Sequence, residues 1–142
     1  NLYGENYVNL YTVPAAQVKK VVNMIDFNNT SFSLPANQTT VVSKSFTFDS
    51  DVAIVSLTSH THERGKLFQI KIKGGSRDGE IIYEDTDWAH PKVINYAQPI
   101  LLKKGEGLTS VVTYVNNTSK TLSFGLTSED EMNIIFGYYY NL

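Results

Sequence analysis

The segment LFQIKIK at residues 67–73 alternates apolar and polar side chains without interruption. In a strand, Phe68, Ile70 and Ile72 point to one face and the polar side chains between them point to the other. The glycine-rich turn signal Gly74-Gly75-Ser76 follows at once. The segment therefore predicts a strand with one buried face and one solvated face.

Similar short apolar segments, separated by turn signals, fill the rest of the chain. They lie at residues 7–13, 18–27, 32–34, 41–48, 52–57, 80–83, 93–102, 108–115, 122–126 and 132–140. They are rich in Val, Ile, Thr, Tyr and Phe, which favour strands. Residues 15–24 also fit a helical period, but their β-branched content favours a strand. The spacing predicts an all-β, two-sheet domain of about ten strands that spans residues 1–142.

The composition narrows the functional classes. The chain has 142 residues, which suits one domain, and its net charge of −2 is spread without a basic block. Nucleic acid is therefore not an expected partner. No apolar run is long enough for a transmembrane segment. Since there is no cysteine, disulfides, thiolate ligands and thiol nucleophiles are excluded. A first residue other than Met is expected to reflect a processed or trimmed N-terminus.

Two of the three histidines, His60 and His62, follow the apolar segment 52–57 directly. Residues at i and i+2 of a strand share a face, so their two imidazoles would lie close enough to share one metal ion. The plainer interpretation is a strand end with two exposed polar residues. Short histidine motifs alone do not decide between the two.

A third metal ligand would have to be His90, a carboxylate or a methionine. Met24 lies among apolar residues and is predicted to be in the core, whereas Met132 follows the polar run 128–131. Core packing is the alternative for Met132 as well. Two imidazoles with a thioether would suit Cu(I) and Cu(II), while a histidine or histidine–carboxylate set would indicate zinc.

Two further residues near these candidates need separate treatment. His90 lies in the loop Asp87-Trp88-Ala89-His90-Pro91. It is either an additional ligand, a residue that contacts a ligand, or an exposed side chain. Glu131 precedes Met132 and is expected to point to the opposite face of a regular strand, so it is not predicted as a ligand.

The run SLTSHTHERGK at residues 56–66 resembles the His-x-His segment of the copper type II, ascorbate-dependent monooxygenases. Residues 29–35 resemble the segment before it, and Asp87-Trp88 with residues 96–105 resembles the middle strands of bacterial relatives. Residues 124–126 and 129–140 are similar to the C-terminal strand, where Glu131-Met132 matches a Glu-Met pair of the family. The resemblance covers residues 29–140.

This resemblance implies a jelly-roll-like antiparallel β-sandwich of about 8–10 strands, similar to the second of two copper domains. It implies that His60, His62 and Met132 hold one copper. In the family this copper binds O₂, or another small exogenous ligand, and attacks a substrate C–H bond. Electrons come from a second copper, held by three histidines of a companion domain, with ascorbate as the reductant. The expected location is secreted, periplasmic or at the cell surface.

The chain also departs from the family. Because only His90 remains outside the motif, this chain cannot build the three-histidine site. The peptide hydroxylase holds its substrate with an arginine, an asparagine and a tyrosine, and the matching positions here are Thr58, Ile134 and Phe136. The apparatus that binds a peptide substrate is therefore missing.

Three functions remain open at this point. The first is the oxygen-binding copper domain of a monooxygenase, which would be incomplete as an enzyme without a second copper site, a partner or a reductant. The second is a non-catalytic copper protein for storage, delivery or sensing. The third is a β-sandwich binding module with a degenerate metal site, in which the aromatic tail at residues 136–140 serves an interface. For that tail we favour simple strand alternation, with Tyr139 facing away from its neighbours.

Overall fold

The alternation at residues 67–73 forms a half-buried strand, as predicted. In the computed structural model, which describes residues 4–142, the side chains of Phe68, Ile70 and Ile72 are 4%, 0% and 2% exposed. Their strand pairs antiparallel with a neighbour on each side. The apolar face of this strand forms part of the core, as its pattern requires.

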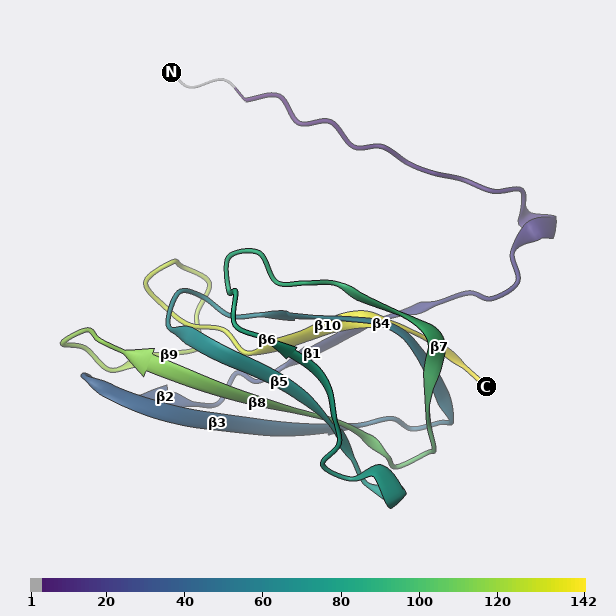
Figure 1. Cartoon of the computed structure of the whole chain (residues 1–142). Helices are drawn as coiled ribbons and strands as arrows, with labels where there is room; N and C mark the ends of the chain where they lie inside the picture. The colour runs from purple at the N-terminus through teal and green to yellow at the C-terminus, as the bar shows by residue number, and fades with distance from the viewer. Residues whose placement is uncertain (1–3) are drawn as a thin grey trace.

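Two four-stranded antiparallel sheets stack face to face (Figure 1). In order of pairing, the first sheet contains β1 (Asn23–Asn28), β10 (Ile134–Asn141), β4 (Val52–His60) and β7 (Ile94–Leu102). The second contains β3 (Gln38–Thr47), β8 (Gly107–Asn116), β5 (Gly65–Lys73) and β6 (Ile81–Asp85). Consecutive long strands often lie in opposite sheets, and the predicted all-β, antiparallel β-sandwich is confirmed.

The core lies between the two sheets and draws apolar side chains from both inner faces. Phe48 packs against Phe27 on one side and Tyr139 on the other, with ring centres 5.4 and 5.1 Å apart. Tyr139 therefore faces inward, as the alternation in the aromatic tail predicts. The aliphatic members with 2% exposure or less are Ile25, Leu34, Val52, Ile54, Leu57, Ile70, Ile72, Leu102, Leu108, Val112 and Ile135.

In β4, the alternation of inward-facing and outward-facing side chains shifts by one residue partway along the strand. Its register against both neighbours shifts between Ile54 and Ser56. Ile54 and Leu57 both face the core and are fully buried, although they are three residues apart. Because of this bulge, Ser56, Thr58 and His60 all project from the outer face of the first sheet.

A small third sheet closes the loop that leads into β10. β2 (Ser33–Leu34) pairs with β9 (Leu122–Ser123), and an isolated bridge then joins Phe124 to Glu131. The side-chain amide of Asn116 donates to the carbonyl oxygens of Leu34 and Lys120 at 2.9 and 2.8 Å. These contacts hold the loop beside the end of β4 that carries the histidines.

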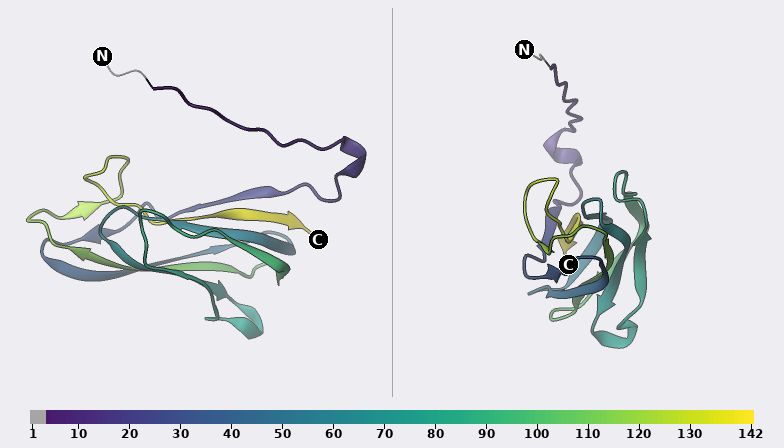
Figure 2. Two further views of the ribbon diagram at one scale, coloured as in Figure 1. Left: turned by 45° about the horizontal axis from the view of Figure 1, so that its top comes forward. Right: turned by 90° about the vertical axis from the view of Figure 1, so that its left-hand side faces the viewer.

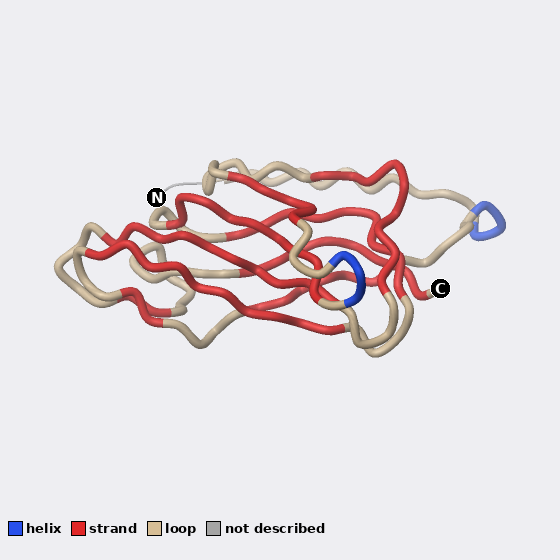
Figure 3. Tube along the Cα trace, turned by 60° about the horizontal axis from the view of Figure 1, so that its bottom comes forward, coloured by secondary structure: helices blue, strands red, loops and turns tan. Residues whose placement is uncertain are grey.

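The N-terminal stretch differs from the prediction. Residues 7–13 form no strand and lie exposed, and the chain before β1 runs away from the sandwich (Figures 1 and 2). Ala15–Gln17 is a short 3₁₀ helix, shown in blue at the right-hand edge of Figure 3; the second blue helix, in front of the sandwich, is Gly75–Arg77. The strand favoured for residues 15–24 is therefore wrong except at its last two positions, because no strand in the described part of the chain pairs with the segment before β1.

The core position predicted for Met24 is also wrong. Its side chain is 61% exposed, because it lies on the outer face of β1 while its neighbour Ile25 takes the buried face. In the part of the chain that the structure describes, no helix is long and apolar enough to cross a membrane.

Candidate metal centre

His60 is the last residue of β4, and its position is set by strand pairing. It lies opposite Ile134 of β10, and its ring centre is 6.4 Å from that of Phe136. The imidazole is half-buried on the outer face of the sheet. Burial lowers the pKa of His60, and the neighbouring His62 lowers it further. The neutral ring, which is the form that binds a metal, is therefore favoured.

His62 lies in the turn that connects β4 to β5. The amide of Gly65 donates to the carbonyl of His62 at 3.1 Å, which closes a four-residue turn. Inside this turn the carboxylate of Glu131 accepts the amide hydrogens of His62 and Arg64, at 3.0 and 2.8 Å. The carboxylate provides the hydrogen-bond acceptors that a neighbouring strand would otherwise provide. The amide and the carbonyl of His62 are therefore both hydrogen-bonded.

Glu131 is therefore a structural carboxylate and lies in the protein interior, with 1% of its surface exposed. Burial raises the pKa of its carboxyl group, while the two amides it accepts act in the opposite direction. It faces the loop backbone of Arg64 and His62 and does not face solvent beside Met132. The structure thus gives Glu131 a role that does not involve metal ligation.

The ring of His62 is oriented by a second contact. Its Nδ1 lies 2.9 Å from the carbonyl oxygen of Asp130. Since a carbonyl only accepts, Nδ1 carries a proton, and in the neutral ring Nε2 is the nitrogen with the free lone pair. A hydrogen bond of this kind selects the tautomer and the ring orientation of metal-binding histidines.

The distance between the two imidazoles fits a shared metal ion. Their ring centres are 5.3 Å apart and their planes are inclined by 82°. A metal–nitrogen bond of about 2.0 Å places each ring centre about 3 Å from the metal, so two ligand rings at a tetrahedral angle lie roughly 5 Å apart. His60 and His62 therefore meet the spacing that two ligands of one metal require.

Met132 lies in the short segment between the Phe124–Glu131 bridge and β10. Its carbonyl oxygen accepts a hydrogen bond from the hydroxyl of Tyr114 at 2.5 Å, and its side chain is half-buried. The β4–β10 register begins with the pair Ile134 and His60, and Met132 lies two residues before Ile134 in the chain. The thioether is thus carried by the segment that adjoins the histidine pair.

His90 lies in the loop that connects β6 to β7. Its side chain is 87% exposed and its Nδ1 is 3.6 Å from the carboxylate of Asp87. Within residues 4–142, no group of three or more His, Asp or Glu side chains is placed to hold a metal ion.

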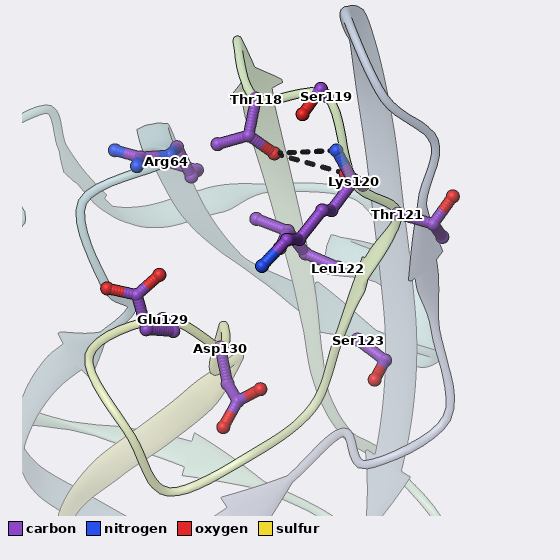
Figure 4. Close-up of a pocket in the computed structure, with 9 residues that line it drawn as sticks. All are labelled: Arg64, Thr118, Ser119, Lys120, Thr121, Leu122, Ser123, Glu129 and Asp130. Carbon is purple, nitrogen blue, oxygen red and sulfur yellow. Dashed lines mark hydrogen bonds between the residues drawn. The ribbon is translucent and has the colours of Figure 1, made fainter.

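A polar recess of about 350 Å³ adjoins the other side of the histidine turn (Figure 4). Lys120 extends into it, and Glu129 and Asp130 lie across from the lysine. Its lining mixes both signs of charge, and the Asp130 carboxylate is occupied by the amide and hydroxyl of Thr127, at 3.2 and 2.7 Å. The recess shares Asp130 with the histidine site but offers no uniform charge to a ligand.

The fold and these residues define a β-sandwich domain with a pair of half-buried imidazoles, one at the end of a central strand and one in the turn that follows it. Residues 13–142 match the family model for the copper type II ascorbate-dependent monooxygenase, C-terminal domain, and the chain belongs to this family. This confirms the resemblance found in the sequence. A comparison with curated proteins gave no match to this chain.

The sequence did not reveal the groups that hold the histidines in place. The Asp130 carbonyl is a backbone atom, so no residue type could have pointed to it. Glu131 was visible as part of a Glu-Met pair, but its partners are backbone amides 67 and 69 residues away. A glutamate beside a predicted ligand and next to a buried strand is the one signal that could have suggested an interior carboxylate.

Proposed function

We propose that this domain binds one copper ion through the imidazoles of His60 and His62 and the thioether of Met132. The domain, taken over residues 1–142, would serve as the oxygen-binding half of a copper monooxygenase. It would need a second copper site in a companion domain, or a reductant such as ascorbate, to act as an enzyme. We expect it to work outside the cytoplasm, since a thioether–imidazole site suits copper that cycles between oxidation states.

One observation carries this proposal: the hydrogen bond from Nδ1 of His62 to the Asp130 carbonyl. This bond orients the ring of His62, and in the neutral ring it leaves the lone pair of Nε2 available to a metal ion beside the ring of His60. Among the residues that the structure describes, no carboxylate or further histidine completes a cluster with this pair. This lack of a hard third ligand favours copper over zinc, in a family whose chemistry uses copper.

The protein's own contribution is to hold two imidazoles in position and leave one side open. Glu131 fixes the turn backbone, Asp130 fixes the ring of His62, and strand pairing fixes His60. A bound copper would supply one-electron chemistry and a position for O₂ or a small exogenous ligand. The half-buried rings leave this position accessible from the outer face of the first sheet.

Anaerobic titration with Cu(I), followed by copper K-edge absorption spectroscopy, tests the proposal. We expect one copper per chain, with two nitrogen neighbours and one sulfur. Copper should also raise the melting temperature of the native chain and leave that of a His60→Ala/His62→Ala variant unchanged. Failure to bind stoichiometric copper, or a metal shell without sulfur, would reject the proposed ligand set.

A second candidate is a non-catalytic copper protein for storage, delivery or sensing. The observation that favours it is the exposed, separate position of His90, the one histidine outside the pair. The chain therefore has no second copper site of the three-histidine type. The two functions differ in kinetics: a catalytic domain, once reduced, consumes O₂ faster than it releases copper, whereas a delivery protein does the reverse.

A further inference from the structure

Residues 7–13 have the sequence of a strand, yet they pair with no other segment of the described chain. The segment, YVNLYTV, is uncharged, is rich in β-branched and aromatic residues, and ends at Pro14. Its large apolar side chains are all exposed: Tyr7 85%, Val8 82%, Leu10 84%, Tyr11 95% and Val13 63%. Such a run of exposed apolar side chains marks an interaction segment.

This segment belongs to an arm, residues 4–22, in which every residue is exposed. Near the base of the arm, the ammonium group of Lys20 lies over the ring of Tyr140, 5.0 Å from its centre. Beyond this contact the chain runs away from both sheets (Figures 1 and 2). The strand-forming part of the arm is therefore not seated on the sandwich of its own chain.

Three of the four edge strands in the described sheets carry features that oppose pairing with another chain. β7 contains Pro99 and borders the bulge of β4. β6 has only five residues and ends in Glu84 and Asp85, and β1 has six residues and contains Asp26. Proline, charge, bulges and short length all protect a sheet edge from strand addition.

β3 is the exception. It has ten residues, contains no proline and carries one charge, at Lys44. It pairs with β8 along its whole length without a register shift, and no strand of the described sheets lies along its other side. That side presents a regular row of backbone N–H and C=O groups, about 33 Å long. A seven-residue strand, about 23 Å long, fits on it.

We propose that residues 7–13 of one copy add as a strand to the free edge of β3 in a second copy, so that two copies exchange arms. The segment without a strand partner and the edge without a neighbour lie in the same chain, and mutual exchange satisfies both in a closed dimer. Phe27 of β1 stacks on Phe46 of β3 with ring centres 4.7 Å apart. The arm, which leads into β1, therefore starts on the side of the sandwich that carries the free edge. This proposal is independent of copper binding.

Sedimentation velocity over a range of protein concentrations tests the dimer. Leu10→Pro removes a backbone donor from the middle of the added strand and should weaken dimerisation by at least about ten-fold. Gly4→Pro is the control, because it places the same residue in the arm but outside residues 7–13. A monomeric native chain, or equal dissociation constants for the two variants, would overturn the proposal.

Cross-linking identifies the edge, because the chain has no cysteine of its own. A Leu10→Cys variant is mixed with a Val41→Cys variant, whose new thiol lies on β3, and treated with a short bismaleimide. The control mixture replaces Val41→Cys by Leu101→Cys, since Leu101 is similarly exposed, 58% against 62%, but lies on β7. We expect cross-linked dimers of Leu10→Cys with Val41→Cys. Equal cross-linking in both mixtures, or a link to β7 alone, would place the arm elsewhere and overturn the proposal.

Discussion

The buried carboxylate of Glu131 accepts a hydrogen bond of 3.0 Å from the backbone amide of His62. Met132 follows Glu131 directly, so the segment that carries the thioether is anchored to the turn that carries one of the imidazoles. The two proposed ligands are 70 positions apart in the sequence, yet a single side chain fixes the relation between their backbones. The geometry of the site depends on that carboxylate.

Glu131→Gln should destabilise the fold. An amide offers one accepting oxygen where the carboxylate offers two, so the amide hydrogen of Arg64 or of His62 loses its partner at a cost of about 1–3 kcal/mol. Urea denaturation measures the loss. Glu129→Gln is the control, since this neighbouring carboxylate is exposed and should change the free energy of unfolding by less than about 0.5 kcal/mol. Equal effects of the two substitutions would show that the hydrogen bonds accepted by Glu131 contribute nothing to the free energy of unfolding.

Met132→Ile should weaken Cu(I) binding more than Cu(II) binding, because a thioether is a soft ligand. His60→Ala and His62→Ala should each weaken both. Competition titrations with chelators of known affinity measure these changes in each oxidation state. An unchanged Cu(I) affinity in Met132→Ile would remove the methionine from the ligand set.

His90→Ala should leave the affinity for Cu(I) and Cu(II) unchanged. Its imidazole is 87% exposed and lies 3.6 Å from the carboxylate of Asp87. The variant is thus a histidine control for the ligand substitutions, measured in the same chelator competition. A loss of affinity comparable to that of His60→Ala would assign His90 to the metal after all.

The free energy of unfolding should fall at alkaline pH, and Tyr96 should contribute to this fall. Its hydroxyl donates to the carbonyl of Ile82 at 2.7 Å, and burial raises its pKa from 10.0 to about 12. Between these values the unfolded chain has lost the proton that the folded chain still holds, so raising the pH favours unfolding. The stability advantage of the native chain over Tyr96→Phe should shrink as pH rises from 10 to 11.5, measured by urea denaturation with about 0.5-unit pH steps. A pH-independent difference would contradict this linkage.

Gly137→Ala should be strongly destabilising. A Cβ atom at this position would lie 2.2 Å from the carbonyl oxygen of Ser56, so the ladder between β10 and β4 would have to move apart. We expect a loss of about 1–3 kcal/mol in thermal or urea unfolding. Gly4→Ala, which meets nothing within 4 Å, is the matched control and should have no effect.

The sequence predicted the fold well where apolar and polar side chains alternate along a strand. Phe68, Ile70 and Ile72 are buried as their spacing required, and Tyr139 faces the core as the aromatic tail indicated. The prediction was wrong for residues 7–13 and for most of residues 15–24. Their local preferences fit strands, but a strand needs a partner, and no part of the described fold pairs with them.

The sequence predicted the candidate ligand residues but not the contacts that hold them in place. The spacing of His60 and His62 was enough to place two imidazoles together, because strand alternation is a local rule. Met24 was misjudged because its apolar neighbours gave no sign of which face β1 would bury. The contacts of Asp130 and Glu131 join segments almost half the chain apart, and only the folded topology brings them together.

The bulge in β4 determines at which positions this strand can lose a residue. Ile54 and Leu57 face inward on either side of it, so one residue between them is surplus to regular alternation. Loss of Val55 would leave Ile54 inside and His60 outside, and the strand would merely become straighter. Loss of a single residue between Leu57 and His60 would turn that imidazole into the core. A single-residue deletion at the bulge, before Leu57, should therefore be tolerated, whereas one between Leu57 and His60 should not.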